Sequence, residues 1–200
     1  EYHMAPIIRQ LFDQDTWTYT YLVADPASGK AALIDPVREQ MDRDLSLIEE
    51  LGVELTRRRV IHKHADHITS AGPLREKTGA QTIASTRGAQ CVDRQVVHGD
   101  RLELGETVIE VIETPGHTDD SLSFRVGSAL FTGDALFVRG CGRTDFQNGD
   151  AGELYDSVTE RLFTLPDDVV VYPGHDYRGH TMSTIGEEKT LNPRLAGRDR

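Results

Sequence analysis

Three histidines and an aspartate lie within six residues, at His62, His64, Asp66 and His67. A strand predicted over residues 55–61 ends directly before them. Alternate residues of a strand project to the same side, so His62 and His64 can face one point. Neutral imidazole and carboxylate groups suit Zn²⁺, Fe²⁺ or Mn²⁺. A solvated polar loop would explain one such histidine, whereas the whole cluster predicts a metal site.

The chain repeats this arrangement at three more places, where a predicted strand ends near a glycine and a metal-capable side chain follows. The strands cover residues 107–113, 129–132 and 169–172, and the residues that follow are Pro115-Gly116-His117, Gly133-Asp134 and Pro173-Gly174-His175. Glycine permits the sharp turn that each place requires. Each residue taken alone would be a turn or cap residue. Together they predict ligands that converge at one edge of a sheet.

Apolar patterning predicts a mixed α/β fold around this site. The other predicted strands cover residues 16–24, 31–34, 81–84, 101–104 and 121–126. One helix carries the apolar stripe Val37, Met41, Leu45, Ile48 and Leu51, and a second runs from Ser70 to about Gly79. A third helix opens at Asp150, where Asp150 and Glu153 resemble a capping box, and it buries Leu154, Val158 and Leu162.

The composition indicates an acidic globular chain. Among 200 residues, 33 are acidic and 22 basic, and the net charge of −11 argues against nucleic-acid or anionic-membrane partners. No apolar run approaches the roughly 18–20 residues of a membrane span, and no secretory signal is recognised. We predict one domain over residues 4–200, with residues 1–3 a cloning remnant. Cys91 and Cys141 are too few for a disulfide framework and favour a reducing compartment.

The order HxHxDH, GH, GD and GH resembles the metallo-β-lactamase superfamily. This resemblance implies an αββα sandwich, in which helices flank two mixed β-sheets and the metal lies at one edge. A narrower similarity, to the persulfide dioxygenases, covers nearly all of residues 8–195. It rests on QLFDQDTWTYTYLVAD, HADHITSAGPL, TGDALFVRGCGRTDFQNG and LFTLPDDVVVYPGHDYRGHTMSTIGEEKTLNPR.

The narrower resemblance implies a non-haem iron enzyme that oxidises glutathione persulfide with O₂ to sulfite and glutathione. Carried over, its ligands are His62, His117 and Asp134, which would hold one Fe(II) per chain. Two histidines and one carboxylate form the facial triad of Fe(II) oxygenases, which leaves coordination positions open. The remaining cluster residues would support these ligands or mark a second metal site no longer used: His64, Asp66, His67 and His175.

The substrate that the resemblance implies, glutathione persulfide, is an anion, so an acidic chain would have to supply local positive charge to hold it. The candidates near the motifs are Arg139, Arg143 and Arg178, with Tyr177 as a hydroxyl donor. We expect at least one arginine to bind a carboxylate of glutathione. The alternative is that each arginine pairs with a carboxylate of the protein itself. Cys141 either lines the pocket or is structural.

Two other functions stay open. A glyoxalase II-like thioester hydrolase would use two metals, with Asp134 bridging and Asp66, His67 and His175 at the second site. Metal content discriminates it from the dioxygenase. A non-catalytic binding protein is motivated by Lys63 and by Arg57-Arg58-Arg59, since charged residues are costly in a buried strand.

The expected partners are small molecules, glutathione persulfide and O₂, and a homodimer is allowed. The expected location is the cytoplasm if the source is bacterial and the mitochondrial matrix if it is eukaryotic. His98 and His180 are expected at the surface.

Overall fold

The computed structural model describes residues 3–61, 71–88, 90, 92–146 and 148–200. The chain divides into two compact units, the first made of residues 1–96 and 101–109 and the second of residues 97–100 and 110–200. The prediction that residues 4–200 form one domain stays a prediction. The cluster from His62 to His67 lies outside the described residues, as does Cys91.

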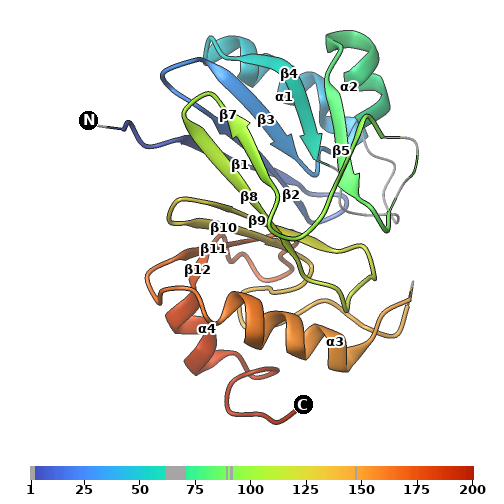
Figure 1. The fold of residues 1–200 in the computed structure, drawn as a ribbon, viewed down its shortest axis with the longest axis vertical. Helices are drawn as coiled ribbons and strands as arrows, with labels where there is room; N and C mark the ends of the chain where they lie inside the picture. The colour runs from blue at the N-terminus through green and yellow to red at the C-terminus, as the bar shows by residue number, and fades with distance from the viewer. Residues whose placement is uncertain (1–2, 62–70, 89, 91, 147) are drawn as a thin grey trace. The chain divides into compact units, whose positions relative to one another are not determined.

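The first unit contains a six-stranded mixed sheet in the order β1-β2-β3-β4-β5-β6 (Figure 1). Neighbours from β1 to β3 are antiparallel, and neighbours from β3 to β6 are parallel. Helix α1 (Met41–Glu50) lies in the crossover from β3 to β4, and helix α2 (Ala71–Thr78) in the crossover from β4 to β5. The strands are β1 (Ile7–Asp13), β2 (Thr18–Ala24), β3 (Lys30–Ile34), β4 (Glu54–Ile61), β5 (Gln81–Ser85) and β6 (Arg94–Val96).

Apolar side chains of β2 and β3 pack against both helices of this unit. Leu22 and Leu33 belong to the same buried cluster as Ile48 of α1 and Leu74 of α2. The predicted stripe is confirmed, although α1 begins only at Met41, after a 3₁₀ turn at Arg38–Gln40. Strand β4 forms across Arg57-Arg58-Arg59 and pairs in parallel with β3 and β5, so these arginines do not prevent the predicted strand.

The second sheet has the order β12-β11-β10-β9-β8-β7. Its strands are β7 (Arg101–Leu104), β8 (Thr107–Glu113), β9 (Leu122–Val126), β10 (Ala129–Gly133), β11 (Val170–Pro173) and β12 (Ser183–Thr184). Strands β8, β9 and β10 are antiparallel neighbours, whereas β10 and β11 run parallel. The parallel pair brings the ends of β10 and β11 together, as the strand-end pattern predicted.

The crossover between β10 and β11 is helical. It consists of α3 (Ala151–Asp156), continued by a π-helix at Ser157–Leu162. The Asp150 side chain accepts a 2.8 Å hydrogen bond from the Glu153 amide, which confirms the predicted N-cap. Leu154, Val158 and Leu162 are buried as predicted, in one cluster with Leu130 and Val171 of the sheet. Helix α4 (Ile185–Leu191) lies on the same side of these strands (Figure 1).

Two mixed sheets with helices are therefore present, as predicted. Four elements were not predicted: β1, β6, β12 and α4. Over the described ranges, no helix combines the length and apolarity that crossing a membrane demands.

Candidate metal centre

His117 sits on a tight turn after β8. Gly116, the residue before it, has a φ of 137°, in the region that favours glycine. A Cβ on Gly116 would lie 2.3 Å from the backbone of Leu154, so the turn rests directly on α3. Glycine is needed here both for the backbone conformation and for this close approach.

Two contacts orient the imidazole of His117. Its Nδ1 lies 2.7 Å from the carbonyl oxygen of Arg143. Because a carbonyl can only accept, Nδ1 carries the proton, and in the neutral ring the lone pair is on Nε2. This Nε2 lies 3.4 Å from Oδ2 of Asp134. An imidazole lone pair and a carboxylate oxygen therefore face each other.

Asp134 follows β10, and His175 follows the parallel neighbour β11. Nδ1 of His175 lies 2.5 Å from Oδ1 of Asp134, and both side chains are buried. Gly174 permits this approach, since a Cβ there would lie 2.9 Å from Oδ1 of Asp134. The ring of His175 stacks on Tyr177, with 6.1 Å between centroids, and meets Phe137 edge-on. The carboxylate of Asp134 thus has His117 on one oxygen and His175 on the other.

Gly142, in the loop that follows β10, packs against both Asp134 and His117. Its amide donates a 2.9 Å hydrogen bond to the carbonyl oxygen of Asp134. A Cβ at this position would lie 2.3 Å from that oxygen and 2.8 Å from Nδ1 of His117. Sequence reasoning missed Gly142, although the run Gly140-Cys141-Gly142 was a signal for a tightly packed loop.

The donor chemistry of His117 and Asp134 fits a cation. Two atoms that bind the same transition metal, each about 2.0–2.2 Å from it, lie at most about 4 Å apart. The 3.4 Å between Nε2 of His117 and Oδ2 of Asp134 is within this limit. Within the described part of the chain, no group of three or more His, Cys, Asp or Glu residues could hold a metal. The predicted ligands and supports His62, His64, Asp66 and His67 lie outside the described residues.

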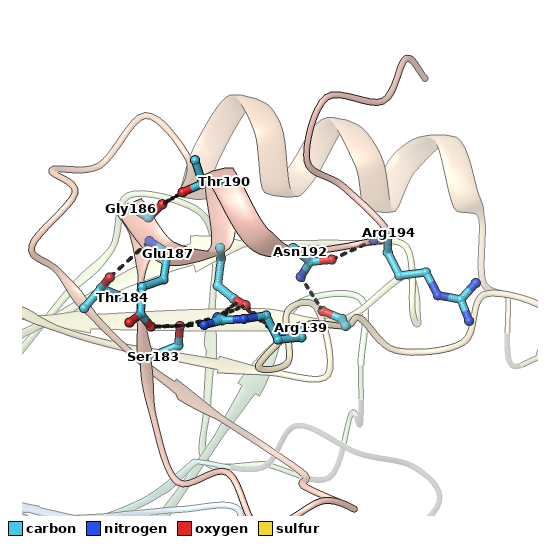
Figure 2. Close-up of polar contacts among 10 residues, drawn as sticks. Arg139, Ser183, Thr184, Gly186, Glu187, Thr190, Asn192 and Arg194 are labelled. Carbon is cyan, nitrogen blue, oxygen red and sulfur yellow. Dashed lines mark hydrogen bonds and ion pairs between the residues drawn. The ribbon is translucent and has the colours of Figure 1, made fainter.

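Arg139 is hydrogen-bonded to residues near the C-terminus of the chain (Figure 2). Its amide lies 2.7 Å, and its Nη1 3.0 Å, from Oε1 of Glu188, a fully buried carboxylate of α4. Its Nη1 also donates to Ser183. Arg139 therefore pairs with a carboxylate of the protein itself, the alternative expected for it, and its role in substrate binding stays a prediction.

Arg143 and Arg178 differ in their partners. The guanidinium of Arg143 makes two hydrogen bonds, of 2.8 and 3.0 Å, to the carboxylate of Asp145. This contact lowers the pKa of Asp145 and raises that of Arg143. Arg178 is exposed, and none of the carboxylates in the described ranges forms an ion pair with it. Tyr177 is exposed beside it.

Cys141 is half-buried and lines a cavity of about 590 Å³ together with Tyr155 and Arg194. Burial raises the pKa of its thiol, and the charge of Arg194 opposes the shift. A raised pKa disfavours the thiolate, which argues against a nucleophilic role. His98 and His180 are both exposed, as predicted.

The chain is similar in sequence and in fold to several known proteins. The model of the metallo-β-lactamase superfamily matches residues 92–175. Over 195 residues the chain is 49% identical to persulfide dioxygenase ETHE1, mitochondrial, of Homo sapiens, covering 96% of this chain and 77% of the relative. It is 38% identical over 181 residues to a hydroxyacylglutathione hydrolase of Rhodospirillum rubrum, covering 88% and 68%. The crystal structure of ETHE1 from Myxococcus xanthus matches with a TM-score of 0.94 and 57% identity, covering 96% of this chain and 86% of that one.

Proposed function

Because this chain belongs to the persulfide dioxygenase family of the metallo-β-lactamase superfamily, we propose that it oxidises glutathione persulfide with O₂. Its fold is the metallo-β-lactamase fold. In the proposed reaction, glutathione persulfide, O₂ and water give glutathione and sulfurous acid, which ionises to sulfite. The observation that carries the proposal is the 49% identity to the human persulfide dioxygenase, which extends over 96% of this chain.

We further propose one Fe(II) per chain, held by His62, His117 and Asp134. His62 enters through the family resemblance, and the facing Nε2 of His117 and Oδ2 of Asp134 support the other two. When bound, the iron would supply a centre where the persulfide sulfur and O₂ meet and exchange electrons. The Arg143 carbonyl keeps the proton of His117 on Nδ1, so that the lone pair of Nε2 is available to bind a metal.

His175 would hold the carboxylate of Asp134 in place. It does so through the 2.5 Å contact with Oδ1, while Tyr177 and Phe137 fix its ring. Outer residues of this kind orient ligands and raise metal affinity. His64, Asp66 and His67 stay predicted as further supports.

Arg178 is the best remaining candidate for binding a carboxylate of glutathione. It carries a full positive charge and no ion pair with the described carboxylates, whereas Arg139 and Arg143 are engaged by Glu188 and Asp145. Tyr177 would add a hydroxyl donor beside it.

A second candidate function is thioester hydrolysis with two metals. The 38% identity to the hydroxyacylglutathione hydrolase favours it, as does the position of His175 against Asp134. In such a hydrolase, His175 would be a ligand of the second metal, and Asp134 would bind both metals.

Parallel assays separate the two candidates. The iron-loaded protein is given glutathione persulfide in an oxygen electrode and S-D-lactoylglutathione in a hydrolysis assay. We expect one O₂ consumed per sulfite formed and no thioester cleavage above the metal-free control. Thioester cleavage without O₂ uptake would overturn the proposal in favour of the hydrolase.

The proposed partners are the small molecules of this reaction. The mammalian relatives are named as mitochondrial. We therefore propose the mitochondrial matrix as the location in a eukaryotic source and the cytoplasm in a bacterial one. The homodimer stays a prediction.

A further inference from the structure

Hydrogen bonds link the chain segment just before His117 to the helical segment that joins β10 to β11. Three carbonyl oxygens of this segment, those of Glu113, Pro115 and Gly116, each accept a hydrogen bond from residues 150–161. The Asp150 amide donates to Gly116 at 2.8 Å. The Ser157 hydroxyl donates to Pro115 at 2.7 Å, and Nη1 of Arg161 donates to Glu113 at 2.5 Å.

We propose that Ser157 and Arg161 are positioning residues for His117, a role that rests on the proposed metal site. They bond to the backbone carbonyls of Pro115 and Glu113, which precede His117 in the chain. Gly116 already lies against the backbone of Leu154, so these bonds fix a turn that is packed on the helix. A small displacement of this turn would move Nε2 of His117 relative to Oδ2 of Asp134.

The π-helix places both donors on the same segment. Its wider turn is marked by the 2.8 Å hydrogen bond from the Phe163 amide to the Val158 carbonyl, a separation of five residues. Single π-helical turns are frequent at functional sites. Ser157 and Arg161, four residues apart, both reach the β8 turn from this segment. The irregular helix thus has a role that the burial of Val158 and Leu162 does not explain.

Ser157 has a good internal control. The Thr159 hydroxyl donates to the carbonyl of Tyr155 at 2.7 Å, a bond within the helix itself. Thr159→Val and Ser157→Ala each delete one hydroxyl with little change of side-chain shape. Only the second deletion breaks a bond to the His117 turn. A purely structural role would make the two variants behave alike.

The test measures metal binding without the reaction. Co(II) is titrated into metal-free parent, Ser157→Ala and Thr159→Val, and its affinity and visible absorption spectrum are recorded. We expect Ser157→Ala to raise the Kd for Co(II) by about 10–100-fold and to shift the spectrum, as loss of outer support does. Thr159→Val should match the parent in both readouts. Unchanged affinity and spectrum in Ser157→Ala, or equal changes in both variants, would overturn the proposal.

Arg161→Met provides a second variant should Ser157→Ala not fold. Its control is Arg125→Met, because Nε of Arg125 donates to the carbonyl of Gly127, away from the His117 turn. We expect weaker Co(II) binding in the first and parental binding in the second. Parental binding in both would count against the proposal. Since no persulfide is used, a protein that binds Co(II) as expected but lacks dioxygenase activity would refute only the proposed function.

Discussion

Among single residues, the proposed metal site depends on two electron-pair donors that face each other, Nε2 of His117 and Oδ2 of Asp134. We expect His117→Ala to lose iron, because the remaining proposed ligands are too few to hold it. The melting temperature of the variant should lie within a few degrees of that of the metal-free parent, because the ring of His117 is not part of the apolar core. Elemental analysis and thermal unfolding check the two statements, and full iron occupancy in the variant would contradict the first.

His175→Ala separates support of a ligand from ligation. We expect iron to remain bound at one per chain but with affinity or activity lowered by about 10–100-fold, because Oδ1 of Asp134 loses its contact with His175. The measurement is iron content after dialysis against a weak chelator, together with the O₂ consumption rate. Loss of one of two metals in this variant would favour the two-metal hydrolase.

Arg178→Met tests the substrate-binding candidate. We expect the KM for glutathione persulfide to rise by about 10–100-fold with unchanged iron content, because a charged hydrogen bond is worth about 1.5–3 kcal/mol. The matched control is Arg143→Met, whose guanidinium already pairs with Asp145. O₂ consumption across a persulfide titration gives both KM values, and a parental KM in Arg178→Met would show that the carboxylate is bound elsewhere.

At the scale of elements, α1 carries an unusual carboxylate. Asp44 is fully buried, and its Oδ1 accepts two 3.0 Å hydrogen bonds from Arg43, while Oδ2 has no hydrogen-bond partner among the described residues. Burial raises the pKa of Asp44 to about 6, against the opposing charge of Arg43. The folded state therefore binds this proton more tightly than the unfolded chain. Its contribution to stability is full below about pH 4 and is lost as the pH rises through about 6.

Asp44→Asn should remove this dependence. We expect its free energy of unfolding, relative to the parent, to increase between pH 4 and pH 7 by on the order of 3 kcal/mol at most. Urea unfolding of the metal-free proteins at several pH values measures it. The control Asp42→Asn, on the same helix but exposed, should show no such trend. If the two variants follow the same pH dependence, the Asp44 pKa is not raised.

The elements that carry the site could be predicted from sequence, whereas several edge elements could not. Strands β8, β9 and β10 are interior strands of the second sheet with mostly buried side chains, so their apolar runs end clearly at turns. Strands β1, β6 and β12 lie at sheet edges, where one side is open and the apolar pattern is weak or short. In α4 the buried residues are Ile185 and Glu188, and a buried glutamate adds nothing to an apolar stripe.

The site shows the same division. The pattern of strands that end next to glycines predicted that His117, Asp134 and His175 lie together, and in the structure Asp134 contacts both histidines. The contact of His117 with the Arg143 carbonyl had no signal in sequence, because every residue has a carbonyl. The pairing of Arg139 with Glu188 joins residues 49 positions apart, which no local pattern encodes.

For the molecule as a whole, we propose that one iron per chain sustains persulfide oxidation. The most direct measurement adds Fe(II) anaerobically to metal-free protein in fractional equivalents and then records O₂ consumption with glutathione persulfide. We expect a rate that rises linearly and stops rising at one equivalent per chain. A rate that reaches its plateau only at two equivalents, or that Zn(II) supports equally well, would contradict it.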